Sequence, residues 1–122
     1  MDMKEFQFFK LVRVPKENER IVFRVLEDCN LSRFILMDNS YDEDGNVSNV
    51  HRHSFVLPNM NVSKGDFLRV YTHKGEAKSF TNKSQTITHE IYWGFKSEVS
   101  IWNKDVDKAY IYKIDSLQVF RV

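Results

Sequence analysis

The sequence predicts an all-β fold of eight or nine short strands. Short runs rich in Val, Ile, Phe and Tyr recur along the chain, and polar turns separate them. No stretch of helical length keeps its apolar residues in a convincing 3.6-residue period. The chain has 122 residues, of which 42% are hydrophobic, and this is enough to build one core. We therefore expect a single domain over residues 1–122.

The expected strands follow the apolar runs in chain order. They are 6–14, 20–26, 33–37, 53–57, 66–72, 89–93, 98–102, 109–114 and 117–121. Alternation of apolar and polar residues is clearest at 20–26, 98–102 and 117–121, and alternate side chains of a strand point to opposite faces of a sheet. The first strand is the ambiguous one, because the spacing of Phe6 and Phe9 also fits a helix.

Turn residues separate these runs. The segment YDEDGN at 41–46 contains Asp and Asn, which bond their own backbone, and a Gly that accepts positive φ. In the segment LPNMNVSKGD at 57–66, Pro58 follows a strand, where its missing N–H matters least. The segment THKGEAKSFTNKS at 72–84 is interpreted as a long hairpin loop.

Composition and charge limit the cellular setting. The formal net charge is +1, so the chain as a whole is not a dedicated nucleic-acid-binding surface. Lys10 and Arg13 interrupt the apolar residues near the N-terminus, so this segment does not have the pattern of a signal peptide. No apolar run approaches the ~18 residues of a membrane helix. A single cysteine, Cys29, fits a reducing compartment. We expect a cytoplasmic protein with no membrane partner.

Catalytic motifs are missing from the sequence. There is no GxSxG elbow, no GxxxxGK[ST] loop and no GxGxxG, and four glycines leave little material for loops that cradle phosphate. Cys29 follows two carboxylates, which would disfavour a reactive thiolate. The sequence therefore predicts no enzyme, no catalytic residue, no cofactor and no small-molecule substrate.

The histidines raise the question of a metal site. In HRH, His51 and His53 would share one face of a strand, and His73 or His89 could complete a three-histidine site if the fold brought them close. The residues that follow, SFVLPNMN, contribute no carboxylate ligand. We expect no metal, with His51 and His53 as the residues to consider for one.

A basic segment at 64–83 interleaves cations with aromatic residues. Its cations are Lys64, Arg69, Lys74, Lys78 and Lys83, and its aromatic residues are Phe67, Tyr71 and Phe80. Cations neutralise phosphates and aromatic rings stack on bases, so this segment is a candidate nucleic-acid contact. Lysines on an exposed hairpin also aid solubility and block edge pairing, and this is the interpretation that we favour.

Four motifs in order resemble a known family. They are RFILMDNS, SFVLP, VSKGDFLRVYTHKG and IWNKDVDKAYIYKID. From about Arg33 to Asp115 the chain is similar to a lamin-tail domain, whose fold is an immunoglobulin-like β-sandwich. The spacing of Trp102, Asn103 and Asp107 in the final corner follows the family. Val106 stands where the family has Gly, and Lys64 stands where it often has Pro.

The resemblance implies an interaction module with no catalytic residues. Lamin-tail domains bind proteins, and those of lamins also bind DNA or chromatin. We expect a protein partner that binds through sheet edges or loops. Nucleic-acid binding by the hairpin 64–83 is the alternative, and a histidine-based metal site is the second alternative. We expect Trp102, Asn103 and Asp107 to form a structural corner, in which Asn103 or Asp107 bonds backbone amides.

Overall fold

The computed structural model describes residues 3–41, 43–48, 51–103 and 107–122. The chain forms two compact units, which are described separately below. Unit 1 comprises Met1–Cys29 and Asn61–Asp107, and unit 2 comprises Asn30–Met60 and Lys108–Val122. The fold is all-β, as predicted, with two single-turn 3₁₀ helices, η1 (Lys16–Asn18) and η2 (Leu31–Arg33).

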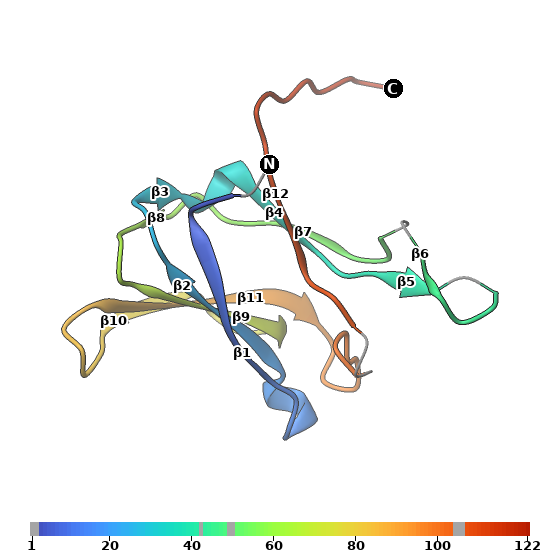
Figure 1. Ribbon diagram of the computed structural model, residues 1–122, viewed down its shortest axis with the longest axis horizontal. Coiled ribbons are helices and arrows are strands. Elements are labelled where there is room, and N and C mark those ends of the chain that lie inside the picture. Colours follow the sequence, from blue (N-terminus) through green and yellow to red (C-terminus); the bar gives the residue numbers. More distant parts are fainter. Residues whose placement is uncertain (1–2, 42, 49–50, 104–106) are drawn as a thin grey trace. The chain divides into compact units, whose positions relative to one another are not determined.

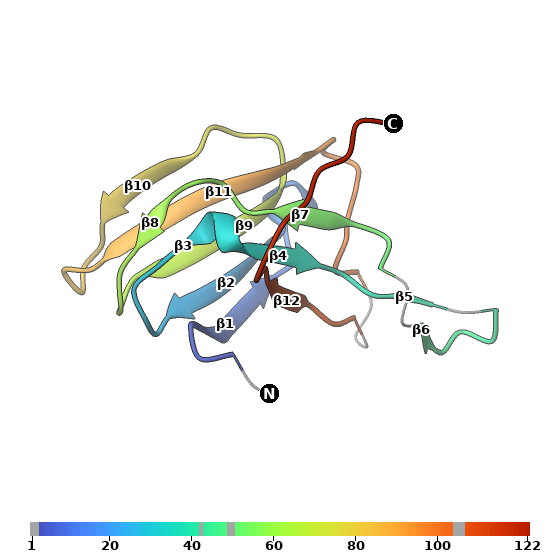
Figure 2. The same ribbon diagram turned by 90° about the horizontal axis from the view of Figure 1, so that it is seen from above.

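Unit 1 is built on a five-stranded sheet (Figures 1 and 2). Its strands are β1 (Phe6–Val12), β2 (Arg20–Val25), β9 (Phe67–His73), β10 (Lys78–Thr81) and β11 (Ile87–Phe95). Their order across the sheet is β1-β2-β9-β11-β10. Neighbouring strands are antiparallel, except that β9 and β11 run parallel. Figure 2 shows the long β11 between β9 and β10.

The prediction of a hairpin over 64–83 is wrong. β10 follows β9 after only four residues, but the two strands are not neighbours, because β11 lies between them and pairs with both. The residues of β10, KSFT, were expected to be loop. Their strand conformation comes from pairing with β11, in which Ser79 lies opposite His89 and Phe80 opposite Thr88.

The register gives the five-stranded sheet two distinct faces. Residues directly opposite one another in a sheet share a face. One face carries Phe80, Thr88 and Phe67 in a row, and it is called the groove face below. The other face carries six of the buried apolar side chains of unit 1: Ile21, Phe23, Val25, Leu68, Val70 and Ile91. It is called the core face.

The segment 98–102 was expected to be a strand and is not one. The physical reason is Glu19, whose side chain is fully buried (0% exposed) just before β2. Its carboxylate accepts hydrogen bonds from the backbone amides of Ile101 (2.8 Å) and Trp102 (3.3 Å). These amides therefore bond a side chain and not a neighbouring strand.

Unit 2 contains a three-stranded antiparallel sheet and a short hairpin. The sheet has the order β12-β4-β7, with β4 at Phe34–Met37, β7 at Ser54–Val56 and β12 at Tyr110–Lys113. The hairpin pairs β5 (Ser40–Tyr41) with β6 (Val47–Ser48). The buried apolar residues of unit 2 are Leu31, Phe34, Leu36 and Leu57. Two further short strands, β3 (Cys29–Asn30) and β8 (Asn61–Val62), lie where the chain passes from one unit to the other.

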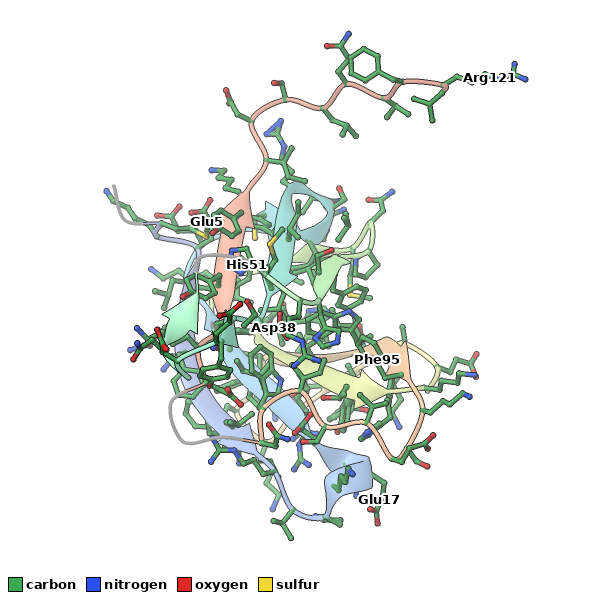
Figure 3. The ribbon with its side chains drawn as sticks, turned by 90° about the vertical axis from the view of Figure 1, so that its right-hand side faces the viewer. Glu5, Glu17, Asp38, His51, Phe95 and Arg121 are labelled. Carbon is green, nitrogen blue, oxygen red and sulfur yellow. The ribbon has the colours of Figure 1, made fainter. Side chains whose placement is uncertain are left out.

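The strand predicted at 117–121 is also absent. Beyond β12 the chain runs on in an open conformation, without folding back on that strand, as the path to Arg121 shows in Figure 3. Its apolar side chains are exposed; they are Leu117, Val119, Phe120 and Val122. Alternation alone therefore did not produce a strand, because no described partner strand pairs with this segment. The expected strands at 6–14, 20–26, 33–37, 53–57, 66–72, 89–93 and 109–114 are confirmed to within a few residues.

Candidate nucleic-acid interface

The groove face of unit 1 contains a cavity of about 460 Å³ with aromatic and basic walls. Three phenyl rings contribute, from Phe9, Phe67 and Phe80, and the cations are Lys10, Arg69 and Lys83. The remaining lining residues are Val22, Thr81, Asn82, Ser84 and Thr88. We call this cavity the aromatic groove. Its volume lies in the range of small-ligand pockets, roughly 300–1,000 Å³.

A β-bulge in β1 places two consecutive residues in the groove. The pairing with β2 shifts between Phe8 and Lys10, so Phe9 is an extra residue on the bulged strand. Such a bulge disturbs the strict alternation of side chains, and both Phe9 and Lys10 line the groove. The ring of Phe9 meets that of Phe67 edge to face, with centroids 5.3 Å apart. Phe9 nevertheless remains 55% exposed, so its ring has free surface.

Arg69 and Phe80 form the opposite part of the groove. The guanidinium of Arg69 lies over the ring of Phe80, 5.9 Å from its centroid, and Phe80 is 40% exposed. Arg69 also donates to the buried carboxylate of Glu90 (3.0 Å), which accepts from Tyr71 Oη (2.8 Å) and lies 3.5 Å from Lys78 Nζ. This carboxylate fixes the direction of the guanidinium.

The pKa of Glu90 reflects these contacts. Burial raises the pKa of this carboxyl, but hydrogen bonds from Tyr71 and Arg69 and the nearby positive charges bring it below its ordinary value. The pKa of Tyr71 is raised, by burial and by its bond to Glu90. Glu90 is therefore ionised at neutral pH and Tyr71 is not.

The hairpin between β10 and β11 closes one end of the groove. Asn82 organises it: its Oδ1 accepts from the amides of Ser84 (3.0 Å) and Thr86 (3.2 Å), and its Nδ2 donates to the hydroxyl of Thr88 (3.1 Å). Gln85 adopts φ of +64°, as tight hairpins require of one residue. This bonding holds the neighbouring Lys83 at the rim of the groove.

The groove is positively charged. No Asp or Glu of the described chain lines it. Lys10 and Lys83 stand on opposite sides, one on β1 and the other in the β10–β11 hairpin, and neither forms an ion pair within the described residues. An anionic ligand with a flat, apolar part therefore finds both kinds of contact here.

Of the five cations predicted to contact nucleic acid, only some lie at the aromatic groove. Arg69 and Lys83 line the groove, and Lys78 faces Glu90 beside it. Lys64 lies in the turn before β9, where its amide bonds Asp28, and Lys74 lines a separate depression with Lys96. Sequence reasoning missed Phe9 and Lys10, since no local signal placed β1 beside residues 64–83.

A second aromatic cluster on the same sheet is closed. Tyr71 and Tyr92 stack with centroids 4.8 Å apart, and Arg20 lies over Tyr71 at 5.6 Å. Gly75 covers Tyr92 so closely that a Cβ there would lie 2.2 Å from the ring. The stacked faces of Tyr71 and Tyr92 are thus covered by protein, whereas Phe9 and Phe80 in the groove remain 55% and 40% exposed.

The histidines do not gather into a metal site. His51 and His53 precede β7 and are not on a strand, contrary to the prediction. Both contact Asp38: His53 Nδ1 lies 2.5 Å from its carboxylate and His51 Nδ1 lies 2.5 Å from its carbonyl oxygen. Figure 3 labels Asp38 and His51 in the same region of unit 2. Within residues 3–41, 43–48, 51–103 and 107–122, no group of three His, Cys, Asp or Glu side chains is placed to hold a metal ion.

The predicted corner is only partly described. Trp102 is buried (2% exposed), its ring lies 6.4 Å from that of Trp93, and its carbonyl oxygen accepts a bond from Arg13. Trp102 is thus a core residue of unit 1. Asn103 is exposed and Asp107 is half-buried. Residues 104–106, including Val106, lie outside the described residues, so the bonding predicted for Asn103 or Asp107 stays a prediction.

No protein-family model, curated protein or solved structure matches the chain. In the part of the chain that the structure describes, no helix is long and apolar enough to cross a membrane.

Two buried carboxylates predict how stability depends on pH. Asp66 and Glu90 both have a pKa below their ordinary values of 3.8 and 4.5 in the folded protein. Their contribution to stability is therefore complete above about pH 4.5 and is lost as the pH falls through the folded-state values. We expect the free energy of unfolding, measured in urea, to fall on acidification below about pH 4.5. Glu90→Gln should flatten this fall, and an identical pH profile in the variant would contradict the prediction.

Proposed function

We propose that this protein binds nucleic acid through the aromatic groove. The observation that supports the proposal is the meeting of three phenyl rings with three cations in one cavity that no described carboxylate lines. Phosphates bind to Lys and Arg, and bases stack on aromatic rings. The rings of Phe9 and Phe80 are partly exposed and can therefore stack on bases. The bases of a duplex are already stacked on one another, so only unpaired bases are open to this contact. The ligand of the proposal is single-stranded nucleic acid.

The place of the groove on the sheet supports the same proposal. In five-stranded oligonucleotide-binding barrels, the OB-folds, the ligand lies on the face of the second and third strands and beside the loop between the fourth and fifth. In this sheet the corresponding strands are β2 and β9, and the corresponding loop is the β10–β11 hairpin. Val22, Phe67 and Lys83 lie on these three elements and line the groove. This is an analogy of position and not of sequence.

Charge reversal at the two rims tests the proposal. We expect Lys10→Glu plus Lys83→Glu to weaken binding of a fluorescent single-stranded oligonucleotide of about 12 nucleotides by roughly 10- to 100-fold at low salt. The slope of log K against log salt should decrease by about 1.4, since each lost phosphate contact on a single strand removes about 0.7. Fluorescence anisotropy over a salt series measures both quantities.

The matched control is Lys74→Glu plus Lys96→Glu. It makes the same change in net charge at the separate depression of unit 1. Its affinity should stay within about threefold of the parent protein, since only general electrostatics change. Equal losses in the two double variants, or no binding by the parent protein at low salt, would overturn the proposal.

The expectation of a protein partner stays a prediction beside this proposal. Two features supply places for such a partner: the outer edge of β10, which pairs with no described strand, and the exposed apolar residues at 117–122. A pull-down with the purified chain checks it. The structure is all-β, and the lamin-tail resemblance stays a prediction. The parallel pairing of β9 with β11 departs from the antiparallel sheets of an immunoglobulin-like sandwich.

A further inference from the structure

The core face of the same sheet carries a chain of three polar side chains that nucleic-acid binding does not use. Ser79 Oγ lies 2.7 Å from His89 Nδ1, and His89 Nε2 lies 2.9 Å from Asp66 Oδ2. The three residues come from β10, β11 and the position just before β9, and strand pairing brings them together. A nucleophile within hydrogen-bond reach of a base, which a third group orients, is the signature of an activated serine.

Asp66 is held firmly as an acceptor. It is buried, and its oxygens also accept from the amides of Ser63 (2.9 Å) and Ile87 (3.0 Å). Burial raises the pKa of this carboxyl, but the bond from His89 and the two amide bonds bring it below its ordinary value. A carboxylate accepts and does not donate, so His89 must donate through Nε2–H.

This bond fixes the tautomer of His89. In a neutral imidazole with its proton on Nε2, the lone pair is on Nδ1, where it can accept a hydrogen bond from the Ser79 hydroxyl 2.7 Å away. Such a bond increases the negative charge on the hydroxyl oxygen. The two ring nitrogens have exchanged the roles they have in the serine-protease triad, and the order of donors and acceptors is the same.

Ser79 is open to a reactant. It is exposed and lies on the outermost strand of the described sheet. The amide of Asn82 donates to Thr86 across the β10–β11 hairpin, so amides at alternate positions, including Phe80, point toward β11. The amide of Ser79 therefore points to the open edge, where it can donate to a carbonyl oxygen that becomes negative during attack.

We propose that Ser79 is a nucleophile that accepts the acyl group of small esters. Its Oγ forms a bond to the ester carbonyl carbon while the hydroxyl proton passes to His89 Nδ1. The ester C–O bond then breaks, and the alcohol leaves with that proton. Water, giving a proton to Nδ1, attacks the acyl-serine, and the serine oxygen regains the proton as the carboxylic acid leaves. In this chemistry Ser79 and His89 are the catalytic residues. Asp66 is a positioning residue, because it acts through His89.

An alkyl fluorophosphonate tests the nucleophile directly. Attack by Ser79 Oγ forms an O–P bond and expels fluoride, so the intact chain gains the mass of one phosphonyl group. We expect stoichiometric labelling at Ser79, located by peptide mass spectrometry. Hydrolysis of p-nitrophenyl acetate should show an initial burst of about one equivalent.

Variants separate a catalytic serine from a structural one. Ser79→Ala should abolish the label, and His89→Gln should slow labelling at least tenfold. Ser97→Ala, which removes an exposed hydroxyl in the turn after β11, should label as the parent protein does. Circular dichroism melts check that each variant is folded; if His89→Gln is not, His89→Asn replaces it. An unlabelled parent protein, an equal label in Ser79→Ala, or an unchanged labelling rate in the folded His89 variant would overturn the proposal.

Discussion

Replacing Glu19 with Ala is expected to lower the free energy of unfolding by about 3–5 kcal/mol, a large part of the roughly 5–15 kcal/mol that holds an ordinary domain together. The carboxylate accepts from the hydroxyls of Thr72 (2.6 Å) and Ser100 (2.5 Å) and from the amides of Ile101 and Trp102. Its removal leaves these buried donors without an acceptor, at about 1–3 kcal/mol for each group that cannot relax. Urea denaturation measures the loss.

Two companion variants make this result specific. Glu19→Gln keeps the shape of the side chain and one acceptor oxygen, but replaces the other oxygen with an NH₂ group that faces hydrogen-bond donors. Because one acceptor remains, we expect a smaller loss in the free energy of unfolding than for Glu19→Ala. Glu17→Ala removes an exposed carboxylate two residues away and should change stability by no more than about 0.5 kcal/mol. If the free energy of unfolding of Glu19→Ala were within about 1 kcal/mol of that of the parent protein, the hydrogen bonds of Glu19 would not be what holds the segment 98–102.

Replacing both Phe9 and Phe80 with Ala should weaken oligonucleotide binding by at least tenfold. A base that stacks on an aromatic ring contributes about 1–3 kcal/mol, and each ring is partly exposed in the groove. Unlike the loss from Lys10→Glu plus Lys83→Glu, this loss should leave the salt slope unchanged, because no phosphate contact is removed. Anisotropy at several salt concentrations distinguishes the two kinds of contact.

Phe8→Ala is the matched control for this experiment. Phe8 is next to Phe9 on β1 and equally exposed (59%), but it lies opposite Phe23, on the core face of the sheet. Its loss should leave affinity within about twofold of the parent protein. A drop as large as that of the double variant would mean that bases do not stack in the groove, and the Phe9 and Phe80 rings would lose their proposed role.

The strands could be predicted where local pattern and tertiary pairing agree. The segment 20–26 alternates, and its apolar residues Ile21, Phe23 and Val25 are buried in the structure. The segment 98–102 alternates equally well, yet its amides bond Glu19, a residue about 80 positions away in the sequence. No property of the segment itself could have revealed that competitor. β10 shows the converse, since KSFT has the composition of a loop and becomes a strand by pairing with β11.

Half of the groove could be predicted and half could not. The basic and aromatic residues of 64–83 indicated a nucleic-acid contact, and Phe67, Arg69 and Lys83 do line the groove. Phe9 and Lys10 depend on a bulge and on the pairing of β1 with β2, which composition does not specify. Ser79, His89 and Asp66 have no fixed spacing that a motif could capture, because only the register of the strands brings them together.

The place of β11 in the middle of the sheet has a consequence for synthesis on the ribosome. β1, β2 and β9 can pair as soon as residue 73 has emerged, but the strand that covers the other edge of β9 is not complete until Phe95. During that interval β9 presents an unpaired edge to other chains, which is a route to misassembly. The nascent chain is therefore most open to aggregation, and to capture by chaperones, while residues 74–95 are emerging from the ribosome.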